Sequence, residues 1–161
     1  MTIRFRVFLD IDKMAKIRLL TSEDIPSVAK IEKLCFSEPW SEESLGLLLQ
    51  EKNAGFVAEV DGVAVAYGGI VTVLDEGQIT NIATHPDHRR CGLAKAIMAA
   101  IDDFSAENRI VYLSLEVREQ NMAARSLYAS CGWQEVGVRK NFYSKPLDNA
   151  IVMIKDFTKG N

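Results

Sequence analysis

The chain has few of the residues that build disulfide scaffolds or metal centres. Its 161 residues include three cysteines and two histidines. The cysteines, Cys35, Cys91 and Cys131, are odd in number and form no C-x-x-C pair, which argues against a disulfide framework and against a zinc site. His85 and His88 lie on a polar stretch without acidic or sulfur partners at ligand spacing. We therefore interpret them as solvated turn residues and expect no metal.

Long apolar runs and an excess of positive charge are also missing. No apolar stretch approaches the ~18 residues that a membrane-spanning helix needs, and residues 1–16 lack the apolar core of a secretory signal. The net charge is −3, and no basic stripe offers the phosphate neutralisation that nucleic-acid binding requires. We therefore expect a cytoplasmic protein, monomeric or weakly homodimeric, with no nucleic-acid and no membrane partner.

What the chain does have is the composition of an ordinary globular domain, with 48% hydrophobic and 25% charged residues. Its length suffices to bury roughly 70% of the surface that the unfolded chain exposes. We assign residues 16–157 to one domain and residues 158–161 to a C-terminal tail. Residues 1–15 are assigned to an N-terminal extension, for which the sequence allows two interpretations. Residues 3–9 alternate like a strand, but the ordered domain could equally begin at Met14.

Apolar periodicity and turn residues predict seven strands and four helices in a mixed α/β, three-layer domain. The predicted strands cover residues 17–20, 56–60, 63–73, 78–84, 110–115, 133–138 and 151–154. The predicted helices begin at Thr21 or Ser22, at Ser41, at Leu93 and at Asn121. Three leucines of the second helix are expected to face inward: Leu45, Leu48 and Leu49.

The most informative segment is the loop at residues 89–94, between the strand that ends near Thr84 and the helix that begins at Leu93. A helix N-terminus leaves about four backbone N–H groups unpaired and carries roughly half a positive charge, which suits a diphosphate. Small residues, here Gly92 and Ala94, let the backbone approach the phosphate oxygens closely. Taken alone, the segment is equally well explained as an ordinary loop with two solvated arginines.

The sequence of this loop, Arg-Arg-Cys-Gly-Leu-Ala, matches the R/Q-x-x-G-x-G/A signature of the GNAT superfamily of N-acetyltransferases, in which it holds the coenzyme A diphosphate. Three further segments resemble the RimI branch, the ribosomal-protein-alanine N-acetyltransferases. They are residues 36–41, residues 115–118 with Asn121 and Tyr128, and residues 139–143 ahead of residues 150–153. The resemblance covers residues 17–154. It implies a GNAT-like α/β (mixed α+β) domain, with a central mixed, largely antiparallel sheet of about seven strands flanked by about four helices.

The resemblance also implies roles for individual residues. Acetyl-CoA is the implied cosubstrate, and a protein or peptide N-terminus, foremost the alanine of a ribosomal protein, is the implied acceptor. Glu116 is the implied proton acceptor and Tyr128 the implied proton donor. The implied contacts to the coenzyme are Ile82, Ala83, Thr84, Arg89, Arg90, Cys91, Gly92, Leu93, Ala94, Lys95 and Asn121.

The chemistry of these side chains suits amide formation from a thioester, which needs a neutral amine, an oxyanion site and a proton for the departing thiolate. An α-amine has a reference pKa of about 7.7–8.0, so a carboxylate such as Glu116, acting directly or through one water, suffices as the base. A phenol such as Tyr128, with a reference pKa near 10, can supply the proton. The oxyanion would meet a backbone N–H near Ala83. Singly, the carboxylate also suits a surface position and the phenol a hydrophobic core.

The segment between the first two helices is a candidate wall of the acceptor pocket. Phe36 and Trp40 flank a stiffening proline there, and the same two aromatics also suit a hydrophobic plug for this connection. Tyr143, shortly before the last strand, is a second candidate wall. Cys91 at a helix N-terminus could in principle form an acyl-cysteine. We favour direct attack, because that thiol would lie among the diphosphate-binding amides and away from the thioester carbon.

Two other functions remain open on the sequence alone. The acceptor could be a small amine such as a polyamine, an amino acid or an aminoglycoside. The domain could also be a catalytically silent acyl-CoA-binding module. The presence of both Glu116 and Tyr128 argues against the silent module.

Overall fold

The computed structural model describes residues 6–10 and 13–159 as eight strands, four α-helices and three 3₁₀ turns. The strands are β1 (Arg6–Asp10), β2 (Lys13–Leu19), β3 (Ala54–Val60), β4 (Val63–Val73), β5 (Glu76–Thr84), β6 (Tyr112–Arg118), β7 (Gln134–Ser144) and β8 (Leu147–Asp156). The helices are α1 (Ile25–Cys35), α2 (Glu42–Leu45), α3 (Leu93–Glu107) and α4 (Met122–Ser130). The 3₁₀ turns are η1 (Ser22–Asp24), η2 (Gly46–Leu49) and η3 (Pro86–His88).

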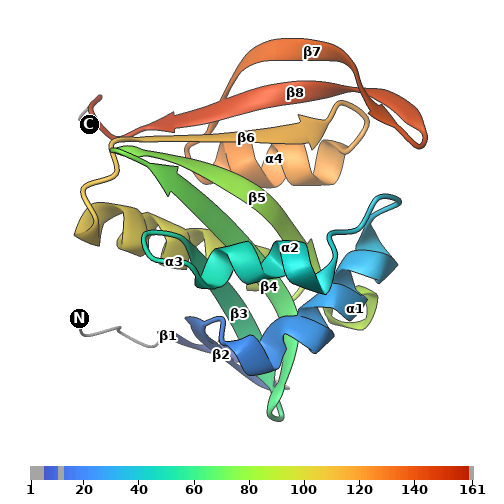
Figure 1. Ribbon diagram of the computed structural model, residues 1–161, viewed down its shortest axis with the longest axis vertical. Helices are drawn as coiled ribbons and strands as arrows, with labels where there is room; N and C mark the ends of the chain where they lie inside the picture. The colour runs from blue at the N-terminus through green and yellow to red at the C-terminus, as the bar shows by residue number, and fades with distance from the viewer. Residues whose placement is uncertain (1–5, 11–12, 160–161) are drawn as a thin grey trace.

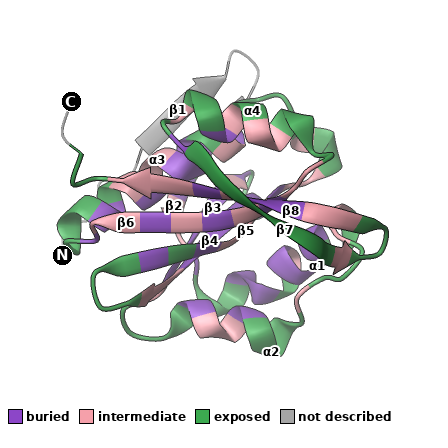
Figure 2. Ribbon diagram, turned by 90° about the horizontal axis from the view of Figure 1, so that it is seen from above, coloured by how far each residue is buried: buried purple, intermediate pink, exposed green. Residues whose placement is uncertain are grey.

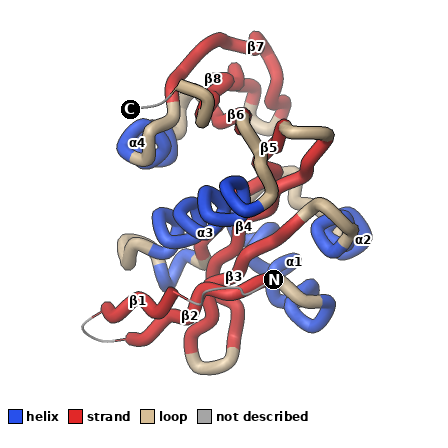
Figure 3. Tube along the Cα trace, turned by 90° about the vertical axis from the view of Figure 1, so that its left-hand side faces the viewer, coloured by secondary structure: helices blue, strands red, loops and turns tan. Residues whose placement is uncertain are grey.

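All eight strands form one sheet in the order β1-β2-β3-β4-β5-β6-β8-β7. Every neighbouring pair is antiparallel except β5 and β6, which are parallel. Helices α1 and α2 cover one face of the sheet, and α3 and α4 cover the other (Figures 1 and 3). This arrangement confirms the predicted three-layer, largely antiparallel fold. The eighth strand, β1, lies within the segment treated as an N-terminal extension. Residues 1–5 and 11–12 of that extension and residues 160–161 of the predicted tail lie outside the described residues.

Two hydrophobic cores, one on each face, hold the three layers together. The first lies under α3 and α4 and includes Phe56 of β3 and Ile97 of α3. The second lies under α1 and α2 and includes the next residue of β3, Val57, with Val28 of α1 and Leu45 of α2. Neighbouring residues of β3 serve opposite cores because side chains of a strand alternate between the two faces. The buried residues therefore follow the central strands, whereas β7 is exposed along almost its whole length (Figure 2).

The second helix is shorter than its periodicity predicts. Helix α2 lasts for four residues and continues as the 3₁₀ turn η2. Leu45 and Leu48 are buried as expected, but Leu49 is 44% exposed, so the prediction that it faces inward is wrong. A 3₁₀ turn has three residues per turn, which aligns positions i and i+3 and rotates position i+4 out of the apolar face.

A bulge separates the two parallel strands at the centre of the sheet. Strands β5 and β6 pair over only three positions, and their pairing ends at Gln78 and Ser114. On the opposite edge of β5 the register against β4 shifts, so that Thr80 and Asn81 together lie opposite Gly69. A bulge of this kind bends the strand that carries the extra residue. Strand β5 therefore turns away from β6, and the two diverge like the arms of a V (Figure 1).

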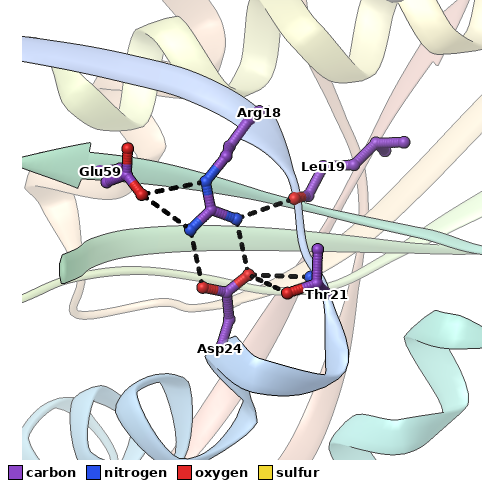
Figure 4. Close-up of polar contacts among 5 residues, drawn as sticks. All are labelled: Arg18, Leu19, Thr21, Asp24 and Glu59. Atoms are coloured by element: carbon purple, nitrogen blue, oxygen red, sulfur yellow. Dashed lines mark hydrogen bonds and ion pairs between the residues drawn. The ribbon is translucent and has the colours of Figure 1, made fainter. Parts of the chain in front are cut away.

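An ion pair fastens the start of the first helical segment to the sheet (Figure 4). Arg18 of β2 donates to both carboxylate oxygens of Asp24, at 2.7 and 2.8 Å, and to Oε1 of Glu59 at 3.1 Å. The backbone N–H of Thr21 donates to the same Asp24 carboxylate at 2.8 Å. Hydrogen bonds from Arg18, which outweigh the opposing effect of burial, hold the pKa of Asp24 below its usual value.

Replacing Asp24 with asparagine is expected to lower the free energy of unfolding by about 2 kcal/mol at pH 7, the size of a lost hydrogen-bonded contact to a charged partner. A carboxyl whose pKa falls on folding stabilises the protein above its unfolded pKa and loses that effect as the pH falls through its folded pKa. The difference between Asp24→Asn and the wild type should therefore shrink below about pH 4. Urea unfolding at pH 7 and pH 3 measures it, and a pH-independent difference would contradict the account.

Candidate active site

The loop between β5 and α3 presents the start of a helix with no side-chain cap. Gly92 is the N-cap residue of α3, with a φ of 74°, and it offers no side-chain hydrogen bond to the first-turn amides. A Cβ placed on Gly92 would meet no atom within 4 Å, so the space beside it is open. Arg89, Arg90 and Cys91 are exposed, and the buried Leu93 anchors the helix start in the first core. The exposed amides and arginines make this loop a suitable cradle for an anionic group.

The other predicted coenzyme contacts continue from this loop in both directions. Ala94 and Lys95 belong to the first turn of α3. Ile82, Ala83 and Thr84 end strand β5, beyond its last paired position with β6. Because β6 has already diverged, the backbone on that edge of β5 is not engaged by the neighbouring strand. The structure thus brings these predicted residues together along one arm of the V and its terminal loop.

Glu116 lies on the other arm of the V. It belongs to β6, where Leu115 and Val117 face the first core, so its side chain is on the α1 and α2 face. Nε2 of Gln78 donates to Glu116 Oε2 at 3.3 Å. Nε of Arg139 lies 3.6 Å from Oε1, and the carboxylate side chain is 19% exposed. The carboxylate is therefore held in place but remains accessible.

Tyr128 approaches from the opposite face. It lies on α4, is 8% exposed, and its ring centroid is 6.3 Å from that of Trp133. Burial, with smaller contributions from Tyr143 and Cys131, raises the pKa of Tyr128 to about 12. The phenol is therefore fully protonated at neutral pH. It is also a weaker acid than a free tyrosine, a shift that the sequence did not predict.

Tyr143 of β7 interacts electrostatically with both candidate catalytic groups. Burial raises its pKa, the charge of Glu116 adds to the rise, and Arg118 opposes it. The guanidinium carbon of Arg118 lies 4.3 Å from the centroid of the Tyr143 ring. Tyr143 also contributes to the raised pKa of Tyr128. Because Tyr143 interacts electrostatically with both, we refer to Glu116, Tyr128 and Tyr143 as the candidate catalytic cluster.

Asn121 has a structural task that its predicted role did not include. It is the N-cap of α4, and its Oδ1 accepts a hydrogen bond from the backbone N–H of Ala124 at 3.1 Å. A side-chain amide has one oxygen and one NH₂ group. With the oxygen engaged in the cap, Nδ2 is the group that the side chain has left to offer a ligand.

The predicted acceptor walls come together through two loops. Phe36 and Trp40 are half-buried against the second core. The connection that carries them touches the turn between β7 and β8, because Ser37 donates to the carbonyl of Lys145 and Ser144 donates to Glu38 at 3.1 Å. The loop therefore packs as a plug and also borders the same region as Tyr143, so its two interpretations are compatible.

A surface groove of about 780 Å³ lies beside this loop, over α2 and η2. Its lining includes Pro39, Trp40 and Leu47 but neither Glu116 nor Tyr128. The groove is therefore separate from both candidate catalytic groups.

The sequence interpretation missed a buried carboxylate next to this region. Glu32 of α1 is fully buried and accepts hydrogen bonds from Tyr67 of β4, from Asn81 of β5 and from the backbone of Trp40. The signal was present in the sequence, because Glu32 lies four residues after Val28 in the apolar stripe of its helix.

Two further observations concern only residues 6–10 and 13–159. Within these ranges no group of three or more His, Cys, Asp or Glu side chains is arranged to hold a metal ion. Likewise, no helix in this part of the chain is long and apolar enough to cross a membrane.

Comparison with known proteins shows the family to which this chain belongs. The profile of the Acetyltransferase (GNAT) family matches residues 25–133. A Bacillus subtilis (strain 168) protein is 38% identical over 141 residues, which is 86% of this chain and 93% of that protein. The [ribosomal protein bS18]-alanine N-acetyltransferase of Escherichia coli (strain K12) is 34% identical over 142 residues, covering 87% of this chain and 96% of the enzyme.

Solved structures agree. The ribosomal-protein-S18-alanine N-acetyltransferase from Escherichia coli superposes with a TM-score of 0.84 at 32% identity, covering 92% of this chain and 97% of that one. Ard1 from Thermoplasma volcanium gives a TM-score of 0.82 at 26% identity, over 88% and 97% of the two chains. The chain belongs to the GNAT family and is an N-acetyltransferase. Enzymes of this family take their acetyl group from acetyl-CoA.

Proposed function

We propose that this enzyme transfers the acetyl group of acetyl-CoA to the N-terminal α-amine of a protein, and that the acceptor is the N-terminal alanine of a ribosomal protein. The observation that carries this proposal is the near full-length match to relatives named for that acceptor, 34% identical over 96% of the Escherichia coli enzyme. Such an acceptor would place the reaction in the cytoplasm. The presence of Glu116 on β6 and of Tyr128 on α4, on opposite faces of the sheet, supports catalysis by direct attack.

The coenzyme would lie along one arm of the V. The first-turn amides of α3 would bind its diphosphate beside Gly92, with Arg89 and Arg90 adding positive charge. The edge of β5 at Ile82–Thr84 would hold the pantetheine arm, with Asn121 contributing from the start of α4. The open space at Gly92 and the lack of a side-chain cap there fit an anionic ligand.

The acceptor amine would enter from the α1 and α2 face, between Phe36, Trp40 and Tyr143. Glu116 would take a proton from the amine, directly or through one water, as the nitrogen attacks the thioester carbon. A backbone N–H near Ala83 would stabilise the developing oxyanion.

Tyr128 would act on the departing sulfur. A free thiol has a reference pKa near 8.5, well below the value of about 12 for Tyr128, so proton transfer to a fully separated thiolate is unfavourable. The phenol would instead donate a hydrogen bond to the sulfur as negative charge builds there, and it would keep its own proton as the C–S bond breaks. The departing coenzyme thiolate would then take its proton from solvent, which leaves the phenol neutral for the next turnover.

Replacing Glu116 with glutamine is expected to lower the acetylation rate about a hundredfold at pH 6.5. The loss should diminish above about pH 8, where an α-amine is already neutral. The measurement is kcat/KM from pH 6 to pH 9.5 for the wild type and the variant. Glu135→Gln is the matched control, because this glutamate pairs with Arg125 outside the cluster. A fold-loss that stays constant across the pH range would remove Glu116 as the base.

The acceptor is tested by incubation with acetyl-CoA and peptides that differ only in their first residue, with mass spectrometry locating the added acetyl group. We expect acetylation of the α-amine, fastest for peptides that begin with alanine. Modification of a lysine side chain, or turnover of a polyamine, an amino acid or an aminoglycoside alone, would contradict the proposed acceptor. Binding of acetyl-CoA without any turnover would identify a silent module.

A further inference from the structure

Glu32 is a fully buried carboxylate that the mechanism above does not use. Its Oε1 accepts hydrogen bonds from the hydroxyl of Tyr67 and from Nδ2 of Asn81, the latter at 2.8 Å. Its Oε2 accepts a hydrogen bond from the backbone N–H of Trp40 at 3.1 Å. Burial raises the pKa of Tyr67, and the neighbouring charge of Glu32 raises it further, so this phenol remains a hydrogen-bond donor.

Two of the three donors belong to different halves of the proposed reaction site. Asn81 lies in the bulge that turns β5 away from β6, directly before the strand end that would hold the coenzyme. Trp40 lies in the loop that would form the acceptor wall. The carboxylate of Glu32 therefore contacts the coenzyme strand through one oxygen and the acceptor loop through the other.

A second contact from the same helix reaches the coenzyme strand. Cys35 lies three residues after Glu32, and its Sγ donates to the carbonyl of Thr84 at 3.3 Å. Nη2 of Arg89, at the start of the diphosphate loop, lies 3.5 Å from the same sulfur. The last turn of α1 thus touches β5 at the bulge and again at its end.

We propose that Glu32 is a positioning residue for acetyl transfer, which fixes the acceptor loop relative to the coenzyme strand. The inference rests on the proposed function for the identity of the acceptor. An attacking amine must lie within about 3–3.5 Å of the thioester carbon, so a small shift between loop and strand is costly in rate. Glu32 sets this spacing because its two oxygens bind the two elements separately.

A carboxylate suits this task where an amide does not. All three partners are hydrogen-bond donors, and a carboxylate offers two oxygens that both accept. In Glu32→Gln the remaining oxygen can still accept the hydrogen bonds from Tyr67 and Asn81. The new NH₂ group then faces the backbone N–H of Trp40, and two donors cannot form a hydrogen bond with each other. The substitution therefore releases the acceptor loop while leaving the coenzyme strand in place.

The first test compares Glu32→Gln with the wild type by amide hydrogen exchange and by steady-state kinetics. We expect faster exchange at the Trp40 amide and a rise of about tenfold in KM for an alanine-starting peptide. The KM for acetyl-CoA should change less than twofold. Unchanged exchange at Trp40 together with an unchanged peptide KM would overturn the proposal.

The second test removes the other link. Asn81→Ala leaves the Trp40 contact intact and frees the bulge, so we expect a rise of about fivefold or more in KM for acetyl-CoA with little change for the peptide. A positioning role therefore predicts that Glu32→Gln raises mainly the KM for the peptide and Asn81→Ala mainly the KM for acetyl-CoA. Equal losses in both constants, or an unchanged acetyl-CoA KM in Asn81→Ala, would overturn the proposal even if Glu32→Gln failed to fold.

Asp24→Asn is the matched control, since it makes the same carboxylate-to-amide change at another buried acid (Figure 4). It should lower the melting temperature and leave the Trp40 exchange rate and both KM values as they are in the wild type. The exchange experiment needs no substrate. A wild type that fails to acetylate the peptide would therefore refute the proposed acceptor, while the Trp40 exchange rate still decides the role of Glu32.

Discussion

Replacing Tyr128 with phenylalanine is expected to lower kcat for acetyl transfer about a hundredfold or more, while the Kd of acetyl-CoA stays nearly unchanged. A positioned acid or base typically contributes a factor of about 10²–10⁴. The phenol acts only as charge builds on the sulfur, so its removal affects the transition state and not the bound coenzyme. Phenylalanine keeps the ring that packs in the first core beside Trp133, so the fold should persist.

Single-turnover kinetics and calorimetric titration with acetyl-CoA separate the two effects in Tyr128→Phe. Tyr112→Phe serves as the control, because this half-buried tyrosine begins β6 at the closed end of the V, where β5 and β6 still pair. A variant with normal turnover at saturation and weakened coenzyme binding would make Tyr128 a structural residue.

Replacing Gly92 with aspartate is expected to raise KM for acetyl-CoA about tenfold to a hundredfold. Aspartate is one of the few residues that tolerates the positive φ of this position, so the loop should keep its shape. Its carboxylate would extend into the open space where the diphosphate is proposed to lie. Two like charges about 5 Å apart repel by roughly 3 kcal/mol at an effective dielectric constant of about 20.

The matched control for Gly92→Asp is Gly92→Asn, which has nearly the same shape, also tolerates positive φ and carries no charge. The difference in KM between the two variants isolates the electrostatic part and should narrow at high salt. Equal KM values in the wild type and both variants would show that the coenzyme diphosphate does not lie at this loop.

Much of the architecture follows from local sequence signals. The turn at Asp61 and Gly62 has positive φ at both residues, as its hairpin motif predicts. Helix α4 begins after Asn121 and is followed by Gly132 at a φ of 92°, again as predicted from its end signals. Such elements are predictable because a few neighbouring residues decide them.

Elements that depend on distant partners were not predictable in the same way. Strand β7 extends to Ser144, well past its predicted end, because pairing with β8 sustains it where almost every side chain is exposed. The bulge at Thr80 and Asn81 is a one-residue shift against β4 that brings Ile79 and Ile82 to the same core. Their three-residue spacing alone did not predict a bulge. Yet this shift produces the divergence of β5 and β6 on which the proposed site depends.

The site itself was accessible to sequence analysis only in part. The loop around Gly92 follows from a motif with a physical rationale, and Glu116 and Tyr128 followed from the family resemblance. The raised pKa of Tyr128 and the hydrogen bonds of Glu32 arise from burial among residues far apart in the chain. Which distant residues surround a side chain cannot be read from local sequence patterns.

The central claim is that amides at the start of α3 bind the coenzyme diphosphate and thereby direct the thioester between Glu116 and Tyr128. A crystal structure of the enzyme with coenzyme A tests it most directly. The account predicts diphosphate oxygens within hydrogen-bond distance of the backbone N–H groups around Gly92, and the sulfur between β5 and β6, close to the Tyr128 hydroxyl. A diphosphate bound elsewhere, or a sulfur directed away from the V, would contradict it.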